Sequence, residues 1–394
     1  IGQSRMLRLL SSPVSKSPDL QSRSMISTRH VAATLAACIV LVATAGRAAD
    51  QAPMVFRHLT RADGLSQASV NDVLQDSQGF IWLATENGLD RYDGANVRRF
   101  KLERSRPDGL ASDYIWALAE DKAGNIWIAT EGGGVAVWNR RTDHVRSYRN
   151  VPGDAQSLGN DSVRDLLVDR SGKVWAATRN AGISVLDPVT GKVTRLAHDP
   201  SRPESLGSNS NVYAVLEDRD GTIWVGTGAG LDRHLGQGNR FEHHVPPAVT
   251  GSQHKLMSLI QDRSGAIWLG SFDVGLQRFD PASGRFVGYR HRARDLASLS
   301  SDDVREVYED TQGRLWVGTA AGLDLLSRET GTFHRYQHER DDPHSIADHF
   351  VTAIAEDRSG LLWVGTKTGG ASRWNPRSWS LGPRAPEWFG GGEI

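Results

Sequence analysis

The residues best able to bind a ligand are aromatic rings mixed with Arg, Asn, Asp and Lys side chains. They lie at the start of a repeated motif or just outside it, and they differ from one copy to the next: Asn71, Tyr114, Trp116, Arg164, Arg179, Asn180, Tyr213, Asp273 and Lys367. Aromatic faces stack on a polar ring, and Arg, Asn and Asp form paired hydrogen bonds with it. Packing imposes one residue type on every copy whereas a ligand does not, so we predict a ligand site here. A solvated loop rim is the alternative for each residue.

The motif itself occurs seven times, each copy beginning with an aliphatic residue and carrying a Trp twelve positions later. The copies are Val70–Thr85, Ile115–Thr130, Val163–Thr178, Val212–Thr227, Leu256–Ser271, Val304–Thr319 and Val351–Thr366. An Asp precedes each Trp by six positions, as in Asp76 and Trp82. Residues repeated at one place in every copy are typical of packing and turns, so we interpret the Trp as core and the Asp as turn formers.

The same reasoning argues against metal or catalytic chemistry. The repeated Asp residues would lie one per unit, far apart, and the His residues lack the spacing of metal ligands. The sequence has no Ser nucleophile elbow, phosphate-binding loop or His-Glu-x-x-His motif. We therefore predict no metal, no cofactor, no catalytic residue and no enzyme activity.

The elements that must position these residues are short strands. In the first copy, Val70–Gln75 and Phe80–Thr85 are apolar runs too short for helices, joined by an Asp-x-x-Gly turn, which indicates a hairpin. A third run follows a Gly, as at Gly88, and a fourth is built on aromatic or apolar residues, as at Phe100. Four strands at a period of 44–49 residues predict an all-β fold, a seven-bladed β-propeller of four-stranded antiparallel blades.

The ends of the repeat array suggest how the ring closes. The seventh unit lacks a clear fourth strand, while Val55–Leu59 is a spare strand before the first unit. We predict that Val55–Leu59 pairs onto the seventh blade, because an open edge strand is a liability.

The remaining organisation is predicted from composition. Lys and Arg number 46 and balance 46 Asp and Glu, which argues against nucleic acid as a partner. We interpret residues 1–24 as an over-extended start and 25–49 as a signal peptide. Residues 50–380 would be the propeller, and 381–394 a tail or the start of a missing domain. An uncleaved anchor or a lipidated Cys38 is the alternative at the N-terminus, and Cys38, the only Cys, leaves no disulfide.

The amino-acid sequence of the repeat resembles that of a known family. Gly64–Ser66, Val70–Thr85 and Asn87–Asp93 closely resemble the two-component regulator propeller repeat, and the likeness extends over residues 54–376, weakest at Leu256–Ser271. The resemblance implies the periplasmic sensor region of a hybrid histidine kinase or diguanylate cyclase, followed by an immunoglobulin-like domain, a membrane span and an output domain. This sequence contains no kinase or cyclase motif, so we expect a fragment or a stand-alone periplasmic binder.

The resemblance also implies a partner. Ligands in this family are often carbohydrate-like, so we expect a small-molecule or oligosaccharide ligand, downstream signalling domains that this chain lacks, and a homodimer as an open option. Two other functions stay open at this point: a propeller lyase or hydrolase acting on a glycan, and a protein-interaction scaffold.

Overall fold

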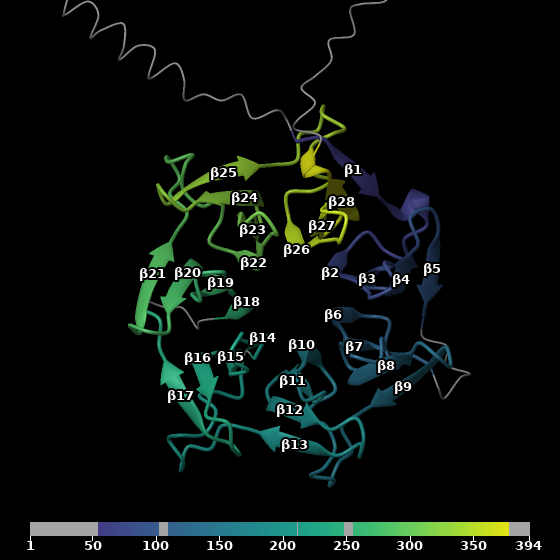
Figure 1. Cartoon of the computed structure of the whole chain (residues 1–394), viewed down its shortest axis with the longest axis vertical. Helices are drawn as coiled ribbons and strands as arrows, with labels where there is room; N and C mark the ends of the chain where they lie inside the picture. Colours follow the sequence, from purple (N-terminus) through teal and green to yellow (C-terminus); the bar gives the residue numbers. More distant parts are fainter. Residues whose placement is uncertain (1–53, 102–108, 211, 248–254, 378–394) are drawn as a thin grey trace, which may run out of the picture. The chain divides into compact units, whose positions relative to one another are not determined.

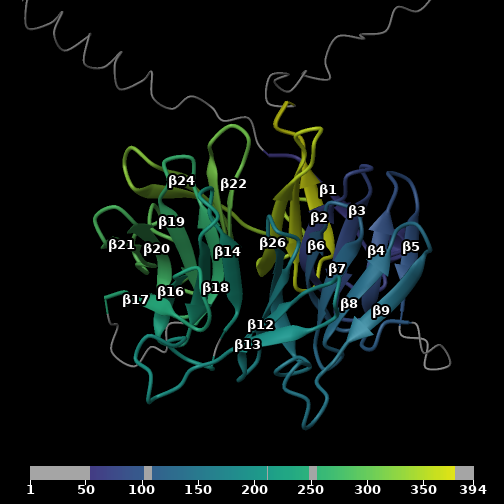
Figure 2. The same ribbon diagram turned by 60° about the horizontal axis from the view of Figure 1, so that its bottom comes forward.

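The computed structural model describes residues 54–101, 109–210, 212–247 and 255–377. The signal peptide interpretation, Cys38 and residues 381–394 lie outside this part. The predicted seven-bladed β-propeller is confirmed, because the described strands form seven four-stranded antiparallel sheets. Figure 1 shows these blades arranged in a ring, and Figure 2 shows them from another side.

Each blade is named by its order in the chain, and its strands run in sequence from the axis outward. Blade 1 contains β2 (Val70–Gln75), β3 (Ile81–Thr85), β4 (Gly88–Tyr92) and β5 (Val97–Phe100). Blade 2 contains β6 (Ile115–Glu120), β7 (Ile126–Thr130), β8 (Val135–Asn139) and β9 (His144–Tyr148). Blade 3 contains β10 (Val163–Val168), β11 (Val174–Thr178), β12 (Gly182–Leu186) and β13 (Val193–Leu196). Blade 4 contains β14 (Ala214–Glu217), β15 (Ile223–Thr227), β16 (Gly230–His234) and β17 (Phe241–His244).

The last three blades complete the ring. Blade 5 contains β18 (Leu256–Gln261), β19 (Ile267–Ser271), β20 (Gly275–Asp280) and β21 (Arg285–Tyr289). Blade 6 contains β22 (Val304–Glu309), β23 (Leu315–Thr319), β24 (Gly322–Ser327) and β25 (Thr332–Tyr336). Blade 7 contains β26 (Val351–Glu356), β27 (Leu362–Thr366), β28 (Ala371–Trp374) and, as its outermost strand, β1 (Phe56–Leu59). A short 3-10 helix, η1 (Arg61–Asp63), follows β1, and no described helix is long and apolar enough to cross a membrane.

Ring closure follows the prediction from the sequence. β1 pairs antiparallel with β28, Phe56 opposite Trp374 and Leu59 opposite Ala371. Phe56 is buried in a cluster with Trp316 and Trp374, so this strand belongs to both the sheet and the core of blade 7. The pairing removes an exposed sheet edge and joins segments from the two ends of the repeat array.

The repeated turn is held by one carboxylate. Asp76 accepts backbone N–H bonds from Gln78 and Phe80 at 2.9 and 3.0 Å, and Gly79 adopts a φ of 99° that favours Gly. These two features of the turn confirm the sequence prediction. The structure adds a third, because the indole of the buried Trp82 donates to Asp76 at 2.9 Å. The same indole bond recurs in all seven blades, so the turn and the core are one unit.

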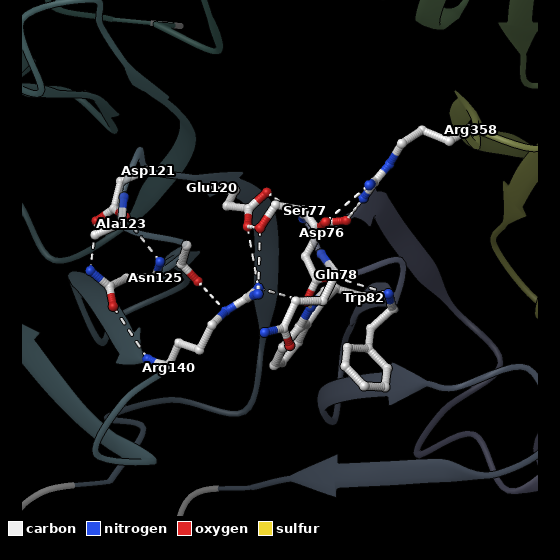
Figure 3. Close-up of polar contacts among 12 residues, drawn as sticks. Asp76, Ser77, Gln78, Trp82, Glu120, Asp121, Ala123, Asn125, Arg140 and Arg358 are labelled. Atoms are coloured by element: carbon white, nitrogen blue, oxygen red, sulfur yellow. Dashed lines mark hydrogen bonds and ion pairs between the residues drawn. The ribbon is translucent and has the colours of Figure 1, made fainter.

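Neighbouring blades are joined through these turns. The Ser77 amide donates to Glu120 of blade 2 at 2.7 Å, and Arg140 reaches back to Asp76 and Glu120 at 2.8 and 3.2 Å (Figure 3). At the closure point, Arg358 of blade 7 donates to the carbonyl oxygens of Asp76 and Ser77 of blade 1. Hydrogen bonds between turns therefore join blade 7 to blade 1, as they join blades 1 and 2.

The closing strand should carry a measurable share of the stability. Replacing Phe56 by Ala removes a buried ring and leaves a cavity, which costs about 3–5 kcal/mol. The midpoint of urea unfolding should fall accordingly. Arg57→Ala, on the exposed face of β1, is the matched control and should leave the midpoint almost unchanged. Equal effects of the two substitutions would contradict closure through β1.

A second prediction concerns the turn carboxylates. Burial raises the pKa of Asp262, but bonds from Ser264, Trp268 and Arg328 outweigh this and lower it to about 2. Asp357 accepts equivalent Ser, Leu and Trp bonds, and its described contacts include no Arg. Asp262 also forms a 2.6 Å ion pair with Arg328, which the Asp262→Asn substitution removes. Asp262→Asn should therefore lower the free energy of urea unfolding by about 2 kcal/mol more than Asp357→Asn does.

The pH dependence of that difference has a definite sign. The folded pKa of Asp262 lies below the ordinary 3.8, so its stabilisation is complete above about pH 4 and is lost as the pH falls toward 2. Equal losses for the two Asn variants at pH 7 would show that the Arg328 pair contributes nothing.

Candidate ligand-binding site

Bulges in the innermost strands aim side chains at the axis. In six blades the register of the first strand shifts after its first residue, for example between Val70 and Asp72. A bulge leaves the extra residue unpaired and turns its side chain away from the sheet. The bulged residues are Asn71, Trp116, Arg164, Met257, Arg305 and Thr352. In blade 4 the corresponding Tyr213 directly precedes β14.

These residues surround a cavity of about 460 Å³ on the propeller axis. All seven blades contribute to its lining, through the first strands and through Lys255 and Phe272, which lie just outside β18 and β19. The volume is within the range of small-molecule sites, about 300–1,000 Å³. Ring closure therefore converts one repeated bulge into one shared pocket.

One wall is an Arg packed between aromatic rings. The guanidinium carbon of Arg164 lies 4.0 Å from the ring centre of Trp116 and 5.9 Å from that of Tyr213. Glu131 orients this wall, accepting from the Trp116 indole at 2.9 Å and pairing with Arg164 at 3.3 Å. Tyr114 extends the aromatic surface, because its ring centre lies 4.7 Å from that of Trp116. Such an arrangement offers both a stacking face and fixed N–H donors.

A similar wall comes from blades 5 to 7. Arg305 lies 4.9 Å from the ring centres of both Phe272 and Phe350 and pairs with Asp303 at 2.6 Å. Lys255 lies 5.0 Å from the Phe272 ring. The Phe272 side chain is 40% exposed and lines the cavity. The two walls come from opposite halves of the ring (Figure 1).

Three carboxyls line the cavity one residue further along the first strands: Asp72, Asp165 and Glu306. Asp72 accepts the amides of Val73 in its own blade and Leu118 in blade 2, both at 2.7 Å. Asp165 likewise accepts Leu166 in its own blade and Val215 in blade 4, both at 2.8 Å.

Glu306 is held through one oxygen. Its Oε1 accepts the Ser258 hydroxyl of blade 5 at 2.8 Å and the Val307 amide at 3.1 Å. Each of the three carboxyls thus accepts a hydrogen bond from a neighbouring blade, so these acidic side chains also link the blades of the ring.

Burial raises the pKa values of these carboxyls. Desolvation raises that of Asp72 to about 6, although two amide bonds oppose it. Desolvation and the charge of Asp72 raise that of Asp165 to about 7. Desolvation and the charges of Asp72 and Asp165 raise that of Glu306 to about 8. The three residues are partly buried where they border the cavity, and desolvation of their carboxyl groups is the main cause of the raised pKa values.

The nine residues proposed from the sequence divide into three groups. Asn71, Trp116, Arg164 and Tyr213 line the cavity. Tyr114, Arg179 and Lys367 lie around it as partners of other side chains: Tyr114 donates to Glu86 at 2.8 Å, Lys367 pairs with Glu86, and Arg179 pairs with Glu131 at 3.5 Å.

Asn180 and Asp273 are not among the lining residues. Asn180 has a φ of 58° in the β11–β12 turn, a conformation that Asn tolerates, and Asp273 contacts Ser271 at 3.3 Å in the β19–β20 turn. Both are turn residues in this structure, because the loops that join second and third strands hold them at the rim.

Sequence reasoning missed Asp72, Asp165, Lys255, Phe272, Arg305 and Glu306. Arg305 occupies the same motif position as Arg164, so alignment of the copies could have found it. The acidic residues stand where other copies have Ala or Ser, a second available signal. Phe272 occupies the same motif position as Arg179 and Lys367, so the same alignment could have found it, although its approach to the cavity depends on the β19–β20 turn.

Comparison with known proteins bears on the family. The model of the two-component regulator propeller repeat matches residues 64–87, 109–132, 205–229, 298–321 and 345–368. Five of the seven blades, 1, 2, 4, 6 and 7, therefore contain the two-component regulator propeller repeat. Blades 3 and 5 lie outside the matched stretches but share the fold of the matched blades. The weakest copy expected from the sequence, Leu256–Ser271, is in blade 5.

Solved and curated relatives agree with the repeat assignment. The extracellular domain of a protein described as a hybrid two component system from B. thetaiotaomicron is 25% identical with a TM-score of 0.71, over 82% of this chain and 42% of that one. Histidine kinase P4 of Formosa agariphila is 40% identical over 53 residues, which are 14% of this chain and 4% of that protein. This propeller chain therefore spans less than half the length of either relative.

A third likeness shows the fold alone. Virginiamycin B lyase from Staphylococcus aureus, solved with quinupristin, has a TM-score of 0.62 at 10% identity, over 82% of this chain and 99% of the lyase.

Proposed function

We propose that the chain is the periplasmic ligand-sensing propeller of a two-component or diguanylate cyclase signalling protein, and that its axial cavity binds the ligand. The observation that carries this proposal is the pocket between the two Arg–aromatic walls, about 460 Å³ in volume and lined by all seven blades. The likeness to the extracellular domain of a hybrid two component system supports export of this chain and its place in signal transduction.

The ligand we propose is carbohydrate-like. Trp116 of blade 2 and Phe272 of blade 5 both line the cavity, and aromatic rings suit the apolar face of a sugar ring. Asn71, Thr352 and Arg164 supply hydrogen-bonding groups between them. Sugars combine such apolar faces with rings of hydroxyls, so stacking and directional hydrogen bonds can act together.

Signalling would follow from contacts with several blades at once. A ligand on the axis touches the first strands of several blades, which also pack against one another through apolar side chains such as Val70 and Ala353. It can therefore favour one arrangement of the blades over another, provided that it binds the two arrangements with different affinity. A following domain or a second protomer would read that shift.

Binding of a panel of neutral and charged oligosaccharides to the full chain tests this proposal. Isothermal titration should find a glycan whose affinity falls about tenfold or more in Trp116→Ala and in Arg164→Met, because each removes a central contact. Arg57→Met, on the outer face of blade 7, is the control and should bind as the unmodified chain does.

Two results would count against this function. Absence of binding to any sugar, peptide or nucleotide would contradict a sensor pocket. Binding that Trp116→Ala leaves unchanged would place the ligand elsewhere. Turnover of a glycan, abolished by Arg164→Met, would replace the sensor by a lyase or hydrolase.

A further inference from the structure

The three carboxyls that line the cavity have no role in sugar stacking, yet they lie at the centre of the ring. Asp72, Asp165 and Glu306 come from blades 1, 3 and 6, at a motif position that is Ala or Ser in the other four copies. An acidic side chain inside a ring of apolar strands is costly unless it is neutralised. The ring nevertheless contains three, and they feel one another's charge.

Neutralisation by cations is incomplete. The cationic groups that line the cavity are Arg164, Lys255 and Arg305. Arg164 pairs with Glu131 and Arg305 with Asp303, while Lys255 lies over the Phe272 ring. Tyr213 is the remaining titratable group of the lining. The two Arg side chains therefore already have acidic partners at the mouth, and protons are the simplest means of neutralising the three carboxyls.

The carboxyls also hold blades together. The Asp72–Leu118 and Asp165–Val215 bonds each join a first strand to the first strand of the next blade, and the Ser258 hydroxyl joins β18 to Glu306 of β22. Mutual repulsion of ionised carboxylates acts on these same strands, because the charges converge on the axis. Their charge state and the spacing of the innermost strands are therefore physically coupled.

We propose that Asp72, Asp165 and Glu306 form a proton-operated link between blades: as the pH rises through the neutral range, repulsion between the ionised groups loosens the innermost strands and thereby regulates the pocket that these residues line. The link is a property of the ring itself; only its effect on ligand binding rests on the proposed function.

The sign of the effect follows from linkage. The folded-state pKa values lie above those of the free side chains, so the folded protein binds protons that the unfolded chain releases. Stability is then greatest below about pH 4 as far as these groups are concerned, and it declines as the pH rises through about 6, 7 and 8.

Glu306→Gln is the clean test. Only Oε1 of Glu306 has described hydrogen-bond partners, and Gln keeps an equivalent oxygen for Ser258 and Val307. The melting temperatures of the variant and the unmodified chain should agree at pH 4 and diverge as the pH rises. The variant should be more stable by about 5 °C at pH 9, because it cannot ionise.

Glu329→Gln is the matched control, since Glu329 is exposed on the turn before β25. The melting temperature of Glu329→Gln should equal that of the unmodified chain at every pH. His243, whose bond to Asp232 raises its pKa to about 9, adds the same slope to all three proteins and cancels in the comparison. Parallel curves for Glu306→Gln and the unmodified chain would overturn the proposal.

Hydrogen exchange supplies a second measurement that does not depend on melting. After correction for intrinsic exchange, protection of Val304–Glu309 should fall between pH 6 and pH 8.5 in the unmodified chain and change less in Glu306→Gln. A loss of protection equal in both proteins would also refute the link. Neither experiment contains a ligand, so a failed glycan screen beside a positive pH result would remove the proposed function alone.

Discussion

Closure of the ring is the constraint on which the rest of this structure depends. A blade cannot bury its faces alone, because each sheet packs against the sheets on either side. Pairing of β1 with β28 supplies the last strand, and Phe56 fills the core beside Trp316 and Trp374. The closed ring brings the seven first strands around one axial cavity.

The repeated motif divides its residues between two tasks. Its Asp and Trp residues join turn to core by the same indole bond in every blade, and turn residues such as Arg358 extend polar contacts to the next blade. Its second residue lines the axial cavity in every blade and varies from copy to copy. This separation explains how one scaffold can keep its packing while the chemistry at its centre changes from blade to blade.

The centre of the ring combines groups with opposing preferences. Arg164 and Arg305 are held against aromatic rings and paired with Glu131 and Asp303, so their charges are fixed near the mouth. The carboxyls beneath them are held by amides and hydroxyls of neighbouring blades. A ligand on the axis would meet stacking faces and donors first, and any movement of the first strands would alter the carboxyls below.

The sequence by itself determined the fold, including its closure, because packing repeats the same apolar and turn residues at a constant place and leaves Val55–Leu59 as an odd strand. It also indicated four cavity residues, Asn71, Trp116, Arg164 and Tyr213. Only the tertiary structure placed Asn180 and Asp273 in turns and brought Phe272 to the cavity. Convergence on an axis depends on bulges and loop paths, which are set by contacts between blades rather than by any residue's own neighbours in the chain.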